Sequence, residues 1–103
     1  FYLVNEDPPP IKEFLSYDAK GLTPPNASPQ TRHLYEGVSM FLTEEQARSL
    51  ARELTGKDWN YIAEVSIPEE VLIERQGRRE GHHLIFAAPA DLKSWVVRVR
   101  SVR

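Results

Sequence analysis

The sequence predicts an α+β fold: a twisted, mostly antiparallel sheet of about five to six strands with two helices. Three observations lead to this class. Apolar and polar residues alternate in several short segments, mostly late in the chain, and helical periodicity is confined to two earlier segments. Turn-forming residues separate these segments. Helices and strands that are not interleaved are typical of α+β domains, and 103 residues are enough for one domain, residues 1–103.

The first third of the chain is expected to form a strand, a helix and a loop. Residues 1–4 are β-prone, and the prolines at 8–10 cannot donate to a sheet, so the strand ends before them. Pro10 suits the first turn of a helix that Gly21 closes, because apolar residues then recur at helical spacing, at Ile11, Phe14, Leu15 and Ala19. Residues 22–31 are rich in proline and small polar residues and predict a surface loop.

The middle of the chain predicts a strand followed by a well-defined helix. Residues 38–42 alternate in a way that suits a strand buried on one face and largely covered on the other. Thr43 and Gln46 then have the spacing of a capping box, which starts a helix at about Glu44. The periodicity continues to about Thr55, and Gly56 stands where a left-handed C-terminal residue is wanted.

The last part of the chain predicts strands and one short turn of helix. Residues 61–67 alternate until Pro68 stops them, and residues 71–75 and 83–87 form a hairpin around a polar turn at 76–81. Residues 89–92 form a turn or a single helical turn. The last strand covers residues 95–100.

Composition excludes several classes of function. The chain has no cysteine, so it has no disulfide, thiolate metal site or cysteine nucleophile. No apolar run approaches the roughly 18 residues of a membrane span and no signal-peptide pattern is present, so we expect a soluble, cytoplasmic protein without a membrane partner.

Charge is distributed unevenly along the chain. Residues 1–70 carry a net charge of −6, and residues 71–103 carry +4. The basic segment could attract phosphate, or it could pair with the acidic segment inside the same domain. Aromatic residues are not interleaved with the arginines and the chain is acidic overall, which argues against a nucleic-acid partner. The arginines concerned are Arg75, Arg78, Arg79, Arg98, Arg100 and Arg103.

Motifs for common catalytic chemistry are missing. The five glycines never approach the spacing of a phosphate-binding loop, a dinucleotide fingerprint or a nucleophile elbow. His82 and His83 are neighbours on a predicted strand, so they point to opposite faces and cannot share one metal ion; we therefore expect no metal site. One of them could face a cleft and act as an acid, a base or a hydrogen-bond donor. Glu64 stands in an apolar strand, where it is either exposed or buried beside a basic partner.

The order of the elements resembles a very small ADP-ribosyltransferase-like domain. The resemblance covers nearly the whole chain in element order and is specific around residues 37–51, a glycine, a strand and a Thr-capped helix that begins with acidic residues. The chain also resembles uncharacterised bacterial proteins with Phe-Tyr at the start, Gly-Val-Ser in the middle and Gly-His-His before the final strands. The resemblance implies a split sheet and a cleft that binds NAD or a related nucleotide.

The family's functional positions are only partly kept here. Ser39 matches the serine or tyrosine of the middle strand. Leu3 stands where the family has a polar residue that holds the dinucleotide. Histidines occupy the stretch where the family has its transition-state glutamate, with Glu80 just before them. A histidine cannot supply a carboxylate's stabilisation of a developing positive charge, so we assign no catalytic residue.

Three hypotheses follow from these patterns. In the first, a degenerate domain binds NAD or another nucleotide without clear catalysis. In the second, the chain is a non-catalytic protein-interaction module, such as a toxin- or phage-associated accessory domain, that uses a sheet edge or the basic last strand, as a homodimer or with another protein. In the third, Glu64 or Glu80 supports transferase or hydrolase activity. The first hypothesis predicts a ligand site lined by Tyr2, Ser39, Phe41 and His83, with Tyr35 or His33 from the proline-rich loop.

Overall fold

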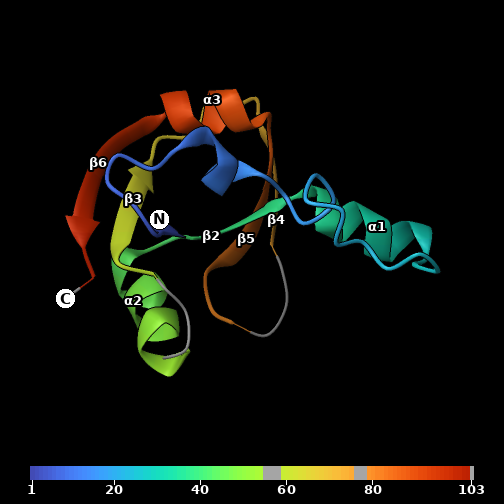
Figure 1. The fold of residues 1–103 in the computed structure, drawn as a ribbon, viewed down its shortest axis with the longest axis horizontal. Coiled ribbons are helices and arrows are strands. Elements are labelled where there is room, and N and C mark those ends of the chain that lie inside the picture. Colours follow the sequence, from blue (N-terminus) through green and yellow to red (C-terminus); the bar gives the residue numbers. More distant parts are fainter. Residues whose placement is uncertain (55–58, 76–78, 103) are drawn as a thin grey trace.

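Six strands form two antiparallel three-stranded sheets in the computed structural model, which describes residues 1–54, 59–75 and 79–102 (Figure 1). Sheet A has the order β1-β3-β6, with strands Tyr2–Val4, Tyr61–Val65 and Val96–Ser101. Sheet B has the order β2-β5-β4, with strands Val38–Phe41, His82–Phe86 and Leu72–Arg75. The predicted α+β class is confirmed, but the strands are divided between two sheets.

The two sheets are linked by hydrogen bonds between Phe1 and Phe41. The backbone N–H of Phe41 donates to the carbonyl of Phe1 over 2.8 Å. The nitrogen of Phe1 donates to the carbonyl of Phe41 over 2.6 Å. The start of sheet A is therefore held at the end of β2 in sheet B.

Four helical segments surround the sheets in the described chain. They are the 3-10 helix η1 (Ile11–Phe14) and the α-helices α1 (Pro29–Glu36), α2 (Glu44–Glu53) and α3 (Pro89–Ser94). In Figure 1, η1 and α3 lie at one end of the sheets and α2 lies at the other, while α1 extends away from both sheets. The exposed position of α1 agrees with its lack of any buried residue.

The helix predicted after Thr43 is confirmed, and so is its cap. The hydroxyl of Thr43 accepts from the N–H of Gln46 over 3.2 Å, and the N–H of Thr43 donates to the Gln46 side chain over 3.1 Å. Two of the N–H groups that a helix start leaves unpaired are thus satisfied. Gly56, the expected residue at the C-terminal end of this helix, lies outside the described residues.

The predicted helix over residues 10–21 is wrong. It is a single 3-10 turn, after which Leu15 is extended. The hydroxyl of Ser16 accepts from the N–H of Ala19 and starts a separate turn, in the way that serine competes with helical hydrogen bonds. Only Phe14 of the expected apolar face is fully buried, whereas Ile11 is 48% exposed, so there is no continuous apolar stripe for a longer helix to bury.

The loop predicted over residues 22–31 is also too long, because α1 begins at Pro29. Pro29 occupies the first helical position, where its missing N–H costs nothing, and the Ser28 hydroxyl caps the N–H of Thr31 over 3.2 Å. The serine and proline that suggested a loop are therefore the start of a helix.

The late strands are confirmed. β4 and β5 pair antiparallel as the expected hairpin, with Arg75 opposite His83. The predicted turn at 76–81 falls partly on residues 76–78, which lie outside the described chain. Residues 89–94 form a short helix, and the last strand begins one residue later than predicted, at Val96.

Two apolar clusters make up the core, and β2 contributes to both. The first lies between sheet B, η1 and α3, and the second lies between β1, β2, β3 and α2. Alternate residues of β2 enter different clusters, because successive side chains of a strand point to opposite faces. The buried members of the first cluster are Phe14, Val38, Met40, Ile85 and Leu92, and those of the second are Leu3, Phe41, Ala47 and Ile62.

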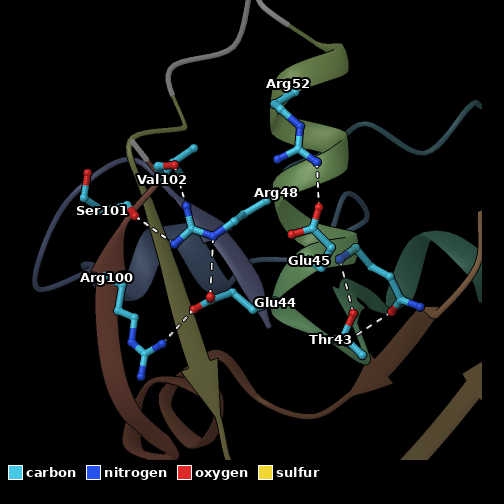
Figure 2. Close-up of polar contacts among 9 residues, drawn as sticks. Thr43, Glu44, Glu45, Arg48, Arg52, Arg100, Ser101 and Val102 are labelled. Carbon is cyan, nitrogen blue, oxygen red and sulfur yellow. Dashed lines mark hydrogen bonds and ion pairs between the residues drawn. The ribbon is translucent and has the colours of Figure 1, made fainter.

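Charged side chains connect α2 to the end of sheet A (Figure 2). The Arg48 guanidinium donates to the carbonyls of Ser101 and Val102 and also pairs with Glu44 over 3.5 Å. Glu44 pairs with Arg100 as well, over 3.3 Å. The charge of Arg100, which belongs to the basic segment, is thus balanced by Glu44 within the domain.

Within the described residues, no helix has the length and apolarity that crossing a membrane requires.

Candidate functional site

A cavity of about 750 Å³ opens between the two sheets and α2. We call it the intersheet cavity. Ligand sites in proteins commonly occupy roughly 300–1,000 Å³, so its size suits a small organic molecule. The residues lining it are Tyr2, Leu3, Leu15, Ser16, Tyr17, Lys20, Gly37, Val38, Ser39, Phe41, Leu50, Leu54, Trp59, Arg79 and His82.

Aromatic rings from both sheets form much of the cavity wall. Tyr2 comes from β1 in sheet A, and Phe41 and His82 come from neighbouring strands of sheet B. The rings of Phe41 and His82 are stacked, with centroids 5.4 Å apart and planes 25° apart. Trp59 adds an indole just before β3. Such walls favour a flat, apolar group that can lie against ring faces.

The histidine that lines the cavity is His82, and His83, which the sequence suggested, is not among the lining residues. In the antiparallel register of β2 and β5, Phe41 lies opposite His82 and Met40 lies opposite His83. Residues directly opposite each other share a face of the sheet. Ser39 and Phe41 therefore face the cavity side together with His82, and His83 faces the other side with Met40. The Nδ1 of His83 lies 2.8 Å from the carbonyl of Gly81.

His33 and Tyr35 do not line the cavity, although the sequence suggested them. His33 is on α1, where its Nε2 lies 2.8 Å from a carboxylate oxygen of Glu74 and its ring stacks on Phe86 at 4.6 Å. These contacts hold α1 to β4 and β5. Tyr35 packs edge to face against Tyr17 at 6.0 Å. Because Tyr17 lines the cavity, Tyr35 supports the wall from outside.

Tyr2, which the sequence suggested, is among the lining residues, and its hydroxyl already makes a hydrogen bond. The hydroxyl donates a hydrogen bond to the backbone carbonyl of Glu13. Burial, together with the charge of the Glu13 carboxylate, raises the pKa of Tyr2 well above its ordinary value, so the phenol stays neutral. The Tyr2 hydroxyl therefore links β1 to η1 and is not available to a ligand in the cavity.

Two cationic side chains at the cavity were not predicted as part of the site. Lys20 lies in the turn after η1, and its ammonium is 5.7 Å from the ring centroid of Tyr17. Arg79 comes just before β5 and pairs with Glu53 at the end of α2 over 2.7 Å. The excess of arginine after residue 70 was the available signal for Arg79. Nothing in the sequence pattern pointed to Lys20, which was expected in a helix.

The two glutamates considered for catalysis lie outside the cavity lining. Glu64 is on β3, opposite Arg98 of β6, and Glu80 is exposed. In the described part of the chain, no three histidine or acidic side chains come together in a way that could hold a metal ion. Besides aliphatic side chains, the cavity lining therefore offers aromatic rings, the hydroxyls of Ser16 and Ser39, and two cations.

Comparison of the chain with family models, with curated proteins and with solved structures finds no match. The assignment of function therefore rests on the geometry of the intersheet cavity.

Proposed function

We propose that this domain binds NAD or a related nucleotide in the intersheet cavity without catalysing its turnover. The observation that supports the proposal is the set of aromatic rings from two sheets around a cavity of about 750 Å³ that also holds the Ser39 hydroxyl. A nicotinamide or adenine ring can lie against Phe41, His82 or Trp59, and Ser39 can hydrogen-bond its polar edge. The charged Lys20 and Arg79 suit the phosphates of such a ligand.

The proposal includes an arrangement like that of the ADP-ribosyltransferases. Two three-stranded sheets that meet at Phe1 and Phe41, with a cavity beside the junction, are consistent with a split sheet. Ser39 lies on β2 within the segment that carries the resemblance.

The absence of catalysis follows from the charge of the lining. Cleavage of a glycosidic bond to a nicotinamide builds positive charge on the ribose, and a carboxylate must stabilise that charge. The described residues that line the cavity include no aspartate or glutamate. His82 belongs to the stretch where the resemblance would put the glutamate, and an imidazole cannot replace a carboxylate at a developing positive charge.

Isothermal titration calorimetry with NAD and with ADP-ribose tests the proposal. We expect saturable binding at millimolar ligand or below and no release of nicotinamide. Ser39→Ala removes the hydroxyl and should weaken binding about 5- to 10-fold, the usual effect of losing one hydrogen bond. Ser66→Ala is the control, because Ser66 is exposed and lies outside the lining. Absence of heat with both ligands, together with an unchanged melting temperature, would contradict the proposal.

The edge of sheet B supports a second candidate, an interaction module that pairs with a second copy of itself. β4 is an edge strand, and two successive residues on its two faces, Leu72 and Ile73, are 54% and 44% exposed. An exposed edge strand with apolar side chains on both faces can pair with the same strand of a second copy. Sedimentation equilibrium decides between the candidates: a dimer that Ile73→Lys dissociates favours the module, and a monomer at 100 μM excludes it.

A further inference from the structure

We propose that Arg79 recognises the phosphate of the bound nucleotide and that the carboxylate of Glu53 competes with that phosphate for it. This inference rests on the proposed function and adds an anion subsite with an internal competitor. It assigns Arg79 and Glu53 to the specificity of the cavity.

The first observation is the position of Arg79. It belongs to the cavity lining, and its guanidinium is directed to the end of α2, where an Nη1 atom lies 2.7 Å from Glu53 Oε2. A guanidinium offers several N–H donors in a planar fork, and this fork matches carboxylate and phosphate oxygens equally well. The Glu53 carboxylate that Arg79 binds here therefore presents the same kind of oxygen acceptors as a phosphate would.

The second observation is the exposure of the two partners. The Glu53 side chain is 61% exposed and that of Arg79 is 37% exposed. Arg79 lowers the pKa of Glu53 by a direct hydrogen bond and by its charge, so the carboxylate is ionised at neutral pH. An ion pair this exposed is weak, because water solvates the separated carboxylate well. The diphosphate of such a nucleotide carries two negative charges against one on Glu53, so it can displace Glu53 into solvent at little cost.

The third observation is the second cation at the cavity. Lys20 also belongs to the lining, and its ammonium lies over the Tyr17 ring and forms no ion pair with any carboxylate of the described residues. A ligand whose aromatic group occupies the cavity can therefore meet positive charge from Lys20 and from Arg79 once Glu53 has moved away. This combination predicts a preference for phosphorylated over unphosphorylated ligands.

A matched ion pair on the same helix provides the control. Glu45 and Arg52 also pair over 2.7 Å on the exposed face of α2 (Figure 2), and neither belongs to the cavity lining. Glu45→Gln and Glu53→Gln thus remove the same charge from the same helix and break ion pairs of the same length. Only the second changes the competition for an arginine of the cavity.

The experiment measures the affinity of ADP-ribose and of adenosine for the wild type and the variants by calorimetry at low salt. Glu53→Gln should bind ADP-ribose about two- to five-fold more tightly, in proportion to the weak ion pair that it removes. Arg79→Gln should weaken ADP-ribose about ten-fold or more, as expected for a lost charge-assisted hydrogen bond. Both variants should bind adenosine like the wild type, and Glu45→Gln should bind both ligands like the wild type.

Each outcome has a distinct meaning. If ADP-ribose and adenosine bind but Glu53→Gln and Glu45→Gln behave alike, the competition is disproved while the proposed function stands. The same holds if Arg79→Gln binds ADP-ribose as the wild type does. If neither ligand binds any form of the protein, the proposed function and this inference both fail. The thermal midpoints of the variants, measured in parallel, separate a loss of binding from a loss of folding.

Discussion

At the scale of single residues, Gly81 shows how closely the site and the helix cap are connected. Its φ is +74°, a conformation that side chains other than glycine rarely adopt, and a Cβ at this position would lie 1.8 Å from Oε1 of Gln46. That oxygen accepts from the N–H of Thr43 in the capping box. Gly81 therefore permits both the approach of β5 to α2 and the cap itself.

Gly81→Ala should lower the free energy of unfolding by about 2–3 kcal/mol, about 1 kcal/mol from the left-handed backbone and the rest from displacing Gln46. Gly21→Ala is the matched control, because Gly21 has nearly the same φ, +75°, with no atom within 4 Å of an added Cβ. Gly21→Ala should lower the free energy of unfolding only by the roughly 1 kcal/mol that the left-handed backbone costs. Urea unfolding of both variants measures the difference, and equal losses would show that Gln46 moves aside without cost.

Tyr2 gives a second prediction at this scale. Its pKa is raised on folding, so the unfolded chain loses the phenol proton near pH 10 while the folded chain keeps it. The unfolded state then binds fewer protons, and stability falls as the pH rises above about 10. Tyr2→Phe should cost about 1 kcal/mol at neutral pH through the lost hydrogen bond and should flatten the alkaline decline. Denaturant unfolding at pH 7 to 11 measures this, and an unchanged alkaline slope in Tyr2→Phe would contradict it.

At the scale of elements, α1 and α2 have similar caps but contribute differently to the fold. Ser28 and Thr43 both accept from the N–H three residues later, over 3.2 Å. α2 buries Ala47 in the second apolar cluster, whereas α1 buries no residue. Tertiary packing supplies most helix stability in proteins, so it stabilises α2 far more than α1.

Thr43→Ala should reduce the free energy of unfolding by about 0.5–2 kcal/mol, the usual cost of removing an N-terminal cap. Ser28→Ala should leave it unchanged within about 0.5 kcal/mol, because α1 can fray without exposing the core. Hydrogen exchange should instead show faster exchange confined to α1 in Ser28→Ala. A loss of global stability in Ser28→Ala as large as that in Thr43→Ala, or unchanged exchange in α1, would count against this division.

At the scale of the whole molecule, β2 joins the two apolar clusters and should make them unfold together. Met40 belongs to the first cluster and its neighbour Phe41 belongs to the second. Trp95 packs on the first cluster and Trp59 on the second, so each cluster has its own fluorescent reporter. Loss of either cluster removes support from β2 and thus from the other.

Leu92→Ala should lower the free energy of unfolding by about 2–5 kcal/mol, because Leu92 is fully buried in the first cluster. The fluorescence of Trp59, measured in a Trp95→Phe background, should report the same shifted midpoint as circular dichroism, although Trp59 packs on the other cluster. A midpoint for Trp59 that stays at the value of the parent protein would show that the clusters unfold independently.

Local patterns determined much of the architecture before any tertiary contact was considered. The capping box at Thr43 and the helix after it depend on interactions within a few residues, and the late strands show a local alternation of apolar and polar residues; all were predicted correctly. The presence of Tyr2, Ser39 and Phe41 beside one cavity also followed from the strands that carry them.

Only the tertiary structure decided the rest, because the outcome depended on what each face of an element packs against. A strand pattern states that His82 and His83 point to opposite faces, but the register of β5 against β2 chooses which of them meets the cavity. Likewise, the helix expected after Pro10 had adequate local periodicity but no second surface to bury it beyond Phe14. Arg79 reaches the end of α2 because the sheet and the helix are brought together by folding, which no local pattern records.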